Sequence, residues 1–128
     1  MLSSHVTSLD LSRKLRDAGV PQVSEFSWVK SPREEKYTLM AVSNDGRTNL
    51  LANGYDVVSA FLSSELGEML KESIYPLPVM EHKTKKWFVP VNGWDLFNGK
   101  YFDTECEARA LMLLHLISSG IINPKALK

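Results

Sequence analysis

Three segments of the chain repeat apolar residues at the three- and four-residue spacing of one face of an α-helix. The first begins at Thr7, which with Asp10 resembles a capping box, and ends at Gly19, shortly before Pro21. Its apolar positions are Leu11, Leu15 and Ala18. The pattern predicts a short amphipathic helix near the N-terminus.

The second segment begins at Ser63 or Ser64, either of which is a suitable N-cap, and ends before Pro76 and Pro78. Its helical stripe consists of Leu66, Met69, Leu70 and Ile74. A second row at the same spacing is acidic and consists of Glu65, Glu68 and Glu72. We interpret that row as the solvent-exposed side of the helix, since rows of acidic residues at this spacing ordinarily face the solvent.

The third segment is the clearest, because Thr104 and Glu107 form a capping box and no helix breaker follows before Gly120. One face of the predicted helix carries Cys106, Ala110, Leu113, Leu114 and Ile117. Three further apolar residues lie well outside that face, namely Leu111, Met112 and Leu116. A helix with so broad an apolar surface must be covered on more than one side. It is therefore either central in the domain or part of a partner surface.

Alternating or β-branched positions predict strands between the helices. Glu25–Lys30 and Tyr37–Ser43 are separated by a polar stretch containing Pro32, which indicates an antiparallel hairpin. The Asp45-Gly46 pair predicts a turn that ends the second strand. The stretch from Thr48 to Leu62 is ambiguous, because "YDVVSAFL" fits either a short strand or the approach to a helix.

A second hairpin is predicted around the stretch "EHKTKKWFVPV", with strand-like residues on both sides of a polar turn. Pro90 cannot donate to a ladder, so the later strand is expected at an edge or a strand end. The predicted order is helix, hairpin, helix, hairpin, helix. That order indicates an α+β domain in which helices pack against antiparallel sheet, with residues 1–128 forming a single domain.

Composition narrows the classes of protein. Of 128 residues, 44% are hydrophobic and 23% charged, which is typical of a globular domain. Fifteen basic residues balance fifteen acidic ones, so no global field attracts a polyanion. The single cysteine excludes an internal disulfide and a multi-cysteine metal site. No leader-like start or membrane-length apolar run occurs, and we expect a cytoplasmic protein without membrane contact.

The segments "LDLSRKLRDAGVPQVSEFSWV" and "CEARALMLLHLISSGII" resemble small proteins carried by bacteriophages and by bacterial genomes with prophages or other mobile elements. In such proteins a leading helix runs into an aromatic strand, and a Glu-Ala-Arg-Ala helix closes the chain. The resemblance spans most of the sequence and implies an intracellular accessory role. It supplies no catalytic residue.

The predicted second hairpin offers one candidate site. Lys83, Lys85 and Lys86 could contact phosphates while Trp87 or Phe88 stacks on a base, which is how single-stranded nucleic acids are commonly bound. Basic residues folded nearby would enlarge the patch, and the candidates are Arg13, Lys14, Arg16 and Lys100. The alternative is a solvated turn whose lysines discourage edge pairing.

Candidate catalytic groups are sparse. The histidines, which are His5, His82 and His115, are far apart in sequence, and none has a second ligand type at a metal-binding spacing. Cys106 lies in the first turn of a predicted helix, where the dipole can lower a thiol pKa, although a small buried core residue is the better interpretation. Phosphate-binding glycine motifs do not occur. We therefore expect no metal or cofactor, and a small hydrolase is the third alternative.

An apolar surplus favours an interaction role. The aromatic residues Trp94, Phe97, Tyr101 and Phe102 lie in one loop, next to a helix with two apolar sides. Exposed aromatic and methionine side chains are typical of interfaces. The expected interface is Trp94, Phe97, Tyr101, Phe102, Leu111, Met112 and Leu116. The leading hypothesis is a non-enzymatic module that binds a protein partner or itself as a homo-oligomer; nucleic-acid binding is the second.

Overall fold

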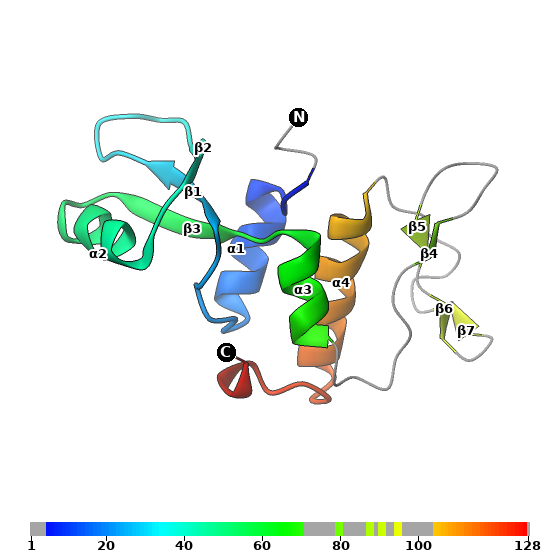
Figure 1. Cartoon of the computed structure of the whole chain (residues 1–128). Helices are drawn as coiled ribbons and strands as arrows, with labels where there is room; N and C mark the ends of the chain where they lie inside the picture. Colours follow the sequence, from blue (N-terminus) through cyan, green and yellow to red (C-terminus); the bar gives the residue numbers. More distant parts are fainter. Residues whose placement is uncertain are drawn as a thin grey trace.

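The computed structural model describes residues 5–70 and 104–127, together with the backbone of four short strands between them. Figure 1 shows a sheet at one end of the molecule, helices packed beside it, and the short strands beyond the helix of residues 105–118. The elements are α1 (Leu9–Asp17), β1 (Phe26–Lys30), β2 (Thr38–Ala41), α2 (Asn44–Ala52), β3 (Asp56–Ala60), α3 (Ser63–Leu70), β4 (Val79–Met80), β5 (Trp87–Phe88), β6 (Pro90–Val91), β7 (Trp94–Asp95), α4 (Glu105–Ser118) and the 3-10 turn η2 (Pro124–Ala126). The α+β class is confirmed. Among the helices in these ranges, none has the length and apolar character needed to cross a membrane.

The main sheet has three antiparallel strands in the order β2-β1-β3. The predicted first hairpin is confirmed, with Phe26 opposite Ala41 and Trp28 opposite Leu39. The Trp28 indole Nε1 donates to the carbonyl of Thr7 at 3.0 Å, and Asp56 of β3 pairs with Arg16 of α1. Helix α1 therefore covers the face of the sheet that carries Trp28 and Asp56.

The outer edge of β3 is closed by side chains. The amide of Ser59 donates to Oε1 of Gln22 at 2.9 Å, and the amide of Phe61 donates to the hydroxyl of Thr7 at 3.0 Å. Gln22 is held in turn by Arg47, whose guanidinium donates to the Gln22 carbonyl. These side chains take hydrogen-bonding groups that another strand would otherwise use.

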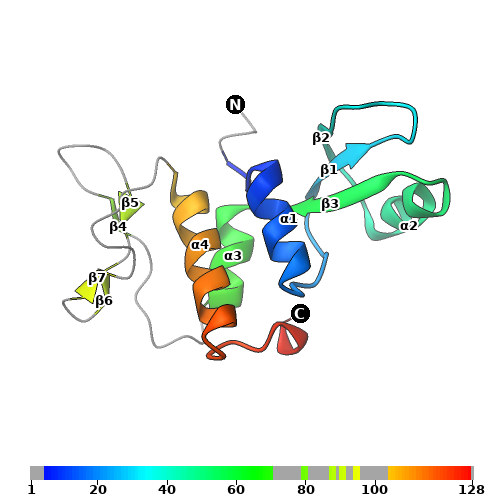
Figure 2. The ribbon, with the colours of Figure 1, turned by 180° about the vertical axis from the view of Figure 1, so that it is seen from behind.

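The hydrophobic core lies between α1, α3 and α4, beside the sheet (Figure 2). Phe61, which follows β3, is completely buried among these helices. The other fully or almost fully buried members are Leu11, Leu15, Val20, Leu66, Leu70, Cys106, Ala108, Ala110, Met112, Leu113 and Leu116. Most of the buried apolar side chains therefore belong to helix-on-helix packing.

The predicted order of elements is wrong between residues 44 and 60. The Asp45-Gly46 pair does not form a turn between strands but lies in the first turn of α2. Ser43 provides the N-cap, since its hydroxyl accepts from the amide of Gly46 at 3.0 Å. The ambiguous stretch that follows contains β3, which pairs with β1 along its full length. A helix and a third strand thus stand where the sequence predicted a turn followed by a stretch of ambiguous pattern.

The predicted helix starts are mostly correct. Ser8 caps α1 by accepting from Leu11, whereas the sequence had indicated Thr7. Helix α3 begins at Ser63, but the Ser63 hydroxyl has no hydrogen-bond partner in the described residues and so does not act as the predicted cap. Helix α4 is capped as predicted by Thr104, whose hydroxyl accepts from the amide of Glu107 at 3.0 Å.

The second predicted hairpin is present as the antiparallel pair β4–β5, in which Val79 lies opposite Phe88 and Met80 opposite Trp87. Its turn, residues 81–86, lies outside the described residues. Two further short strands, β6 and β7, pair with each other.

Candidate interaction surface between the first and last helices

Helix α4 occupies the middle of the molecule. It contacts α3, α1 and β5, so it is covered on more than one side (Figures 1 and 2). Met112 and Leu116 are completely buried in the core, as is Leu113. Met112 and Leu116 were expected at a partner surface, but their complete burial leaves them no surface to offer in this fold. Leu111 remains only partly buried.

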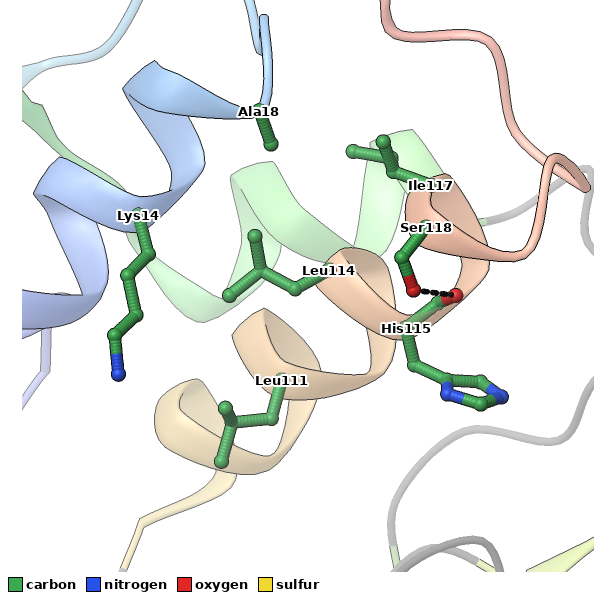
Figure 3. A pocket seen from close by; sticks show the side chains of 7 residues that line it. All are labelled: Lys14, Ala18, Leu111, Leu114, His115, Ile117 and Ser118. Atoms are coloured by element: carbon green, nitrogen blue, oxygen red, sulfur yellow. Dashed lines mark hydrogen bonds between the residues drawn. The ribbon is translucent and has the colours of Figure 1, made fainter.

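A groove runs between α4 and α1, with a volume of about 570 Å³. Leu111, Leu114 and Ile117 lie three residues apart along α4, so they form one stripe of the helix, and each is only partly buried. Figure 3 shows the Leu114 side chain directed toward α1 between Leu111 and Ile117. The remaining lining residues are Lys14, Ala18, His115 and Ser118.

Polar groups of the groove lie at its rim. The Lys14 ammonium pairs with Asp10 at 3.2 Å, four residues earlier on α1, and both side chains are largely exposed. The Ser118 hydroxyl donates to the carbonyl of His115 at 2.9 Å. The His115 ring points away from α1 (Figure 3). The groove therefore offers apolar contact along its length and charge only at the border, which is the composition of a binding surface.

Cys106 is a core residue. It is 2% exposed, and its thiol donates to the carbonyl of Phe61 at 3.2 Å. Burial raises the pKa of the Cys106 thiol to about 12, and the nearby Arg109 charge lowers it too little to compensate. A thiol with such a pKa stays protonated near neutral pH, so Cys106 does not provide a nucleophile.

A polar network connects α1 with the sheet. The Arg13 guanidinium donates to the Tyr37 hydroxyl at 3.0 Å and stacks over the ring of the same tyrosine. The Tyr37 hydroxyl donates to Asp56, and Arg16 donates to the other carboxylate oxygen at 3.0 Å. Burial raises the pKa of Asp56, but the hydrogen bond from Tyr37 and the charge of Arg16 outweigh burial and hold that pKa below its usual value. The carboxylate is thus a structural anchor.

Arg13 hydrogen-bonds to Tyr37 and Arg16 to Asp56, whereas the lysines of the predicted nucleic-acid patch lie outside the described residues. Both views place α4 between α1 and the β4–β5 pair (Figures 1 and 2). Trp87 and Phe88 form β5 as predicted, and Trp94 begins β7. The remaining predicted site residues lie outside the described part of the chain: His82, Lys83, Lys85, Lys86, Phe97, Lys100, Tyr101 and Phe102.

The sequence pattern did not indicate Ala18, Leu114 or Ile117 as surface residues, and it indicated Lys14 only as a candidate member of the nucleic-acid patch. Leu114 and Ile117 had been assigned to the core face of α4 on a helical wheel. The three-residue spacing that joins Leu114 and Ile117 to Leu111 was the available signal. That spacing could not show which side of the helix the rest of the fold leaves uncovered.

Within residues 5–70 and 104–127, no three histidine, cysteine or acidic side chains come together as a metal site. No family model, curated protein or solved structure matches this chain.

Proposed function

We propose that this chain is a non-enzymatic, cytoplasmic accessory protein of phage or mobile-element type that forms a homodimer through the groove between α1 and α4. The observation that supports this proposal is the apolar stripe of Leu111, Leu114 and Ile117, which remains partly exposed along one side of the central helix α4. Removing such a surface from water is the main source of association free energy. The single, buried thiol fits a reducing compartment.

A second copy is the favoured occupant for two reasons. The chain has a formal net charge of zero, so no long-range repulsion opposes the approach of two copies. A two-fold arrangement also covers the same stripe on both chains at once, because a symmetric interface uses one patch twice. In an antiparallel crossing of two α4 helices, Leu114 of each chain lies near the two-fold axis and contacts its counterpart.

Light scattering coupled to size-exclusion chromatography tests the proposal. The wild-type chain should have twice the mass of 14.4 kDa at micromolar concentration. Leu114→Glu places a charge at the centre of the interface and should raise the dimer dissociation constant by at least about 100-fold, as loss of a central apolar anchor does.

The matched control is Leu51→Glu, which makes the same change at an exposed leucine of α2. That variant should remain dimeric, and circular dichroism should show both variants folded. A wild-type chain that stays monomeric over a wide range of concentrations overturns the proposal, as does a Leu114→Glu variant with an unchanged dissociation constant.

A further inference from the structure

The main sheet has one open edge, which belongs to β2. The amide of Val42 donates to the carbonyl of Glu25 at 3.2 Å, so these two residues form a hydrogen-bonded pair of the β1–β2 ladder. Along two antiparallel strands, hydrogen-bonded pairs alternate with pairs that are not hydrogen-bonded to each other. Met40 and Thr38 therefore also point their backbone groups toward β1, and Leu39 and Ala41 point theirs outward.

The outward groups of β2 are free in the described chain. No residue there hydrogen-bonds to the backbone amide or carbonyl of Leu39 or Ala41 on the outer side. The strand "TLMA" carries no charge, and Met40 is 40% exposed. Natural edge strands often carry a lysine, a proline or a covering side chain that prevents pairing. The opposite edge has such protection from Gln22 and Thr7, whereas β2 has none.

An acidic hollow adjoins this edge. Ala41 and Val42 line a depression of about 540 Å³ at the end of the sheet, together with Glu25 and Glu65. The Glu65 carboxylate already accepts from the amides of Leu62 at 2.7 Å and Glu25 at 3.0 Å, which fixes its position. The side chain of Glu25 is exposed. The hollow thus carries negative charge beside an unpaired strand.

We propose that the β2 edge binds an extended peptide of a partner protein as a fourth strand, and that a lysine or arginine of this peptide enters the hollow at Glu25. An antiparallel peptide strand would exchange four backbone hydrogen bonds with Leu39 and Ala41. Glu25 and Val42 are cross-strand neighbours, so their side chains share one face of the sheet.

The spacing of strands determines which peptide residue meets Glu25. A residue paired with Val42 on its outer side lies two strand spacings, roughly 10 Å, from Glu25. The extended side chain of a lysine or arginine together with that of the glutamate covers this distance. Backbone pairing with β2 fixes which peptide residue lies near Glu25. The site should therefore distinguish peptides by the charge at that single position. This inference concerns a different surface from the α1–α4 groove and does not depend on dimerisation there.

A peptide array provides the test. The probes are immobilised eight-residue peptides of alternating valine and threonine, in which one position at a time is lysine, arginine, glutamine or glutamate. The full-length protein should bind most strongly when lysine or arginine occupies one particular position, and at least tenfold more weakly when glutamate replaces it there.

Three variants separate backbone pairing from charge. Ala41→Pro removes an outward amide without touching the ladder to β1, a position where edge strands tolerate proline, and should abolish binding while the fold persists by circular dichroism. Ala41→Val keeps the amide and should bind normally. Glu25→Lys should reverse the preference toward glutamate peptides.

The outcomes are decisive in either direction. Equal binding by Ala41→Pro and the wild-type chain refutes strand addition, and a charge preference that Glu25→Lys leaves unchanged refutes the assigned hollow. Failure of every peptide to bind the folded protein overturns the proposal as a whole. Because Leu114→Glu lies on the other surface, this variant should bind these peptides normally. The dimer proposal and the peptide-binding proposal are therefore tested independently.

Discussion

Replacing Thr7 by valine should destabilise the protein through a single buried hydrogen-bonding group. Thr7 is 1% exposed, and its hydroxyl accepts from the amide of Phe61 at 3.0 Å and lies 2.7 Å from the hydroxyl of Ser12. The carbonyl of Thr7 accepts from Trp28 and from Ser12 at 3.3 Å. This cluster joins the N-terminal segment, α1, β1 and the end of β3.

The magnitude follows from the groups that lose a partner. Valine has the shape of threonine without the hydroxyl, so the Phe61 amide becomes a buried donor without an acceptor, which costs about 1–3 kcal/mol. Ser12 keeps its bond to the Thr7 carbonyl. The extra methyl group returns at most about 0.8 kcal/mol. We expect a net loss of about 2 kcal/mol in the free energy of unfolding, or a fall of about 8 °C in Tm for a chain of this size.

Urea unfolding followed by tryptophan fluorescence and circular dichroism measures this change. Thr7→Ser retains the hydroxyl and should lose only about 1 kcal/mol, the value of one buried methyl group. A double-mutant cycle with Ser12→Ala should show coupling of at least about 0.5 kcal/mol, since the two hydroxyls are in contact. If Thr7→Val unfolds within about 0.5 kcal/mol of the wild-type chain, the hydroxyl is not the required acceptor and the reasoning fails.

Three other predictions concern separate parts of the fold. Gly67→Ala should destabilise the protein despite its better helix propensity, because the new Cβ would displace Nη1 of Arg109 from the carbonyl of Ser63, to which it donates at 2.8 Å; thermal melting should show a smaller loss when Arg109→Ala is already present. Asp56 has a lowered pKa in the folded protein, so it contributes stability above its unfolded pKa and loses it as pH falls through the folded one. Asp56→Asn should therefore cost up to about 1 kcal/mol near pH 6 in urea unfolding, a difference that shrinks as the pH falls through the folded pKa. Cys106 should react with a thiol reagent at pH 8 only as fast as the protein unfolds, and rapid labelling of the folded chain would contradict its burial.

The helices that could be predicted are those whose signals are local. In α4 the cap at Thr104, the unbroken run and the stop at Gly120 all act within a few residues, and the structure uses each of them. Helix α2 lacks this consistency, because none of its residues is fully buried and so no apolar stripe marks it. Asp45-Gly46 resembles a hairpin turn, and only the cap from Ser43 and the neighbouring β3 select the helix.

Strand β3 was ambiguous for a related reason. Val57, Val58, Ser59 and Ala60 are all buried, so no alternation of apolar and polar residues distinguishes a strand from a helix segment. Its identity depends on the ladder to β1, a contact between residues about 30 positions apart. Periodicity within one segment contains no information about such a partner.

The candidate interaction surface was predicted to lie near α4, but with partly incorrect residues. A helical wheel orders the apolar positions around α4 without showing where its neighbours lie. Met112 and Leu116 are completely buried in the core, whereas Leu111, Leu114 and Ile117 are partly buried and border the groove. The open β2 edge had no signal in the sequence, since the free groups belong to the backbone.

The unequal edges of the sheet limit how far copies of this chain can join. Fibril growth requires a strand that pairs on both of its sides, so that each arrival leaves a fresh place for the next. In the main sheet, Gln22 and Thr7 occupy the amides of Ser59 and Phe61 on the outer side of β3, whereas no side chain of the described residues occupies the outer side of β2. If two chains paired through their β2 strands, the open edge of each would be covered, and assembly by that route would end at a dimer.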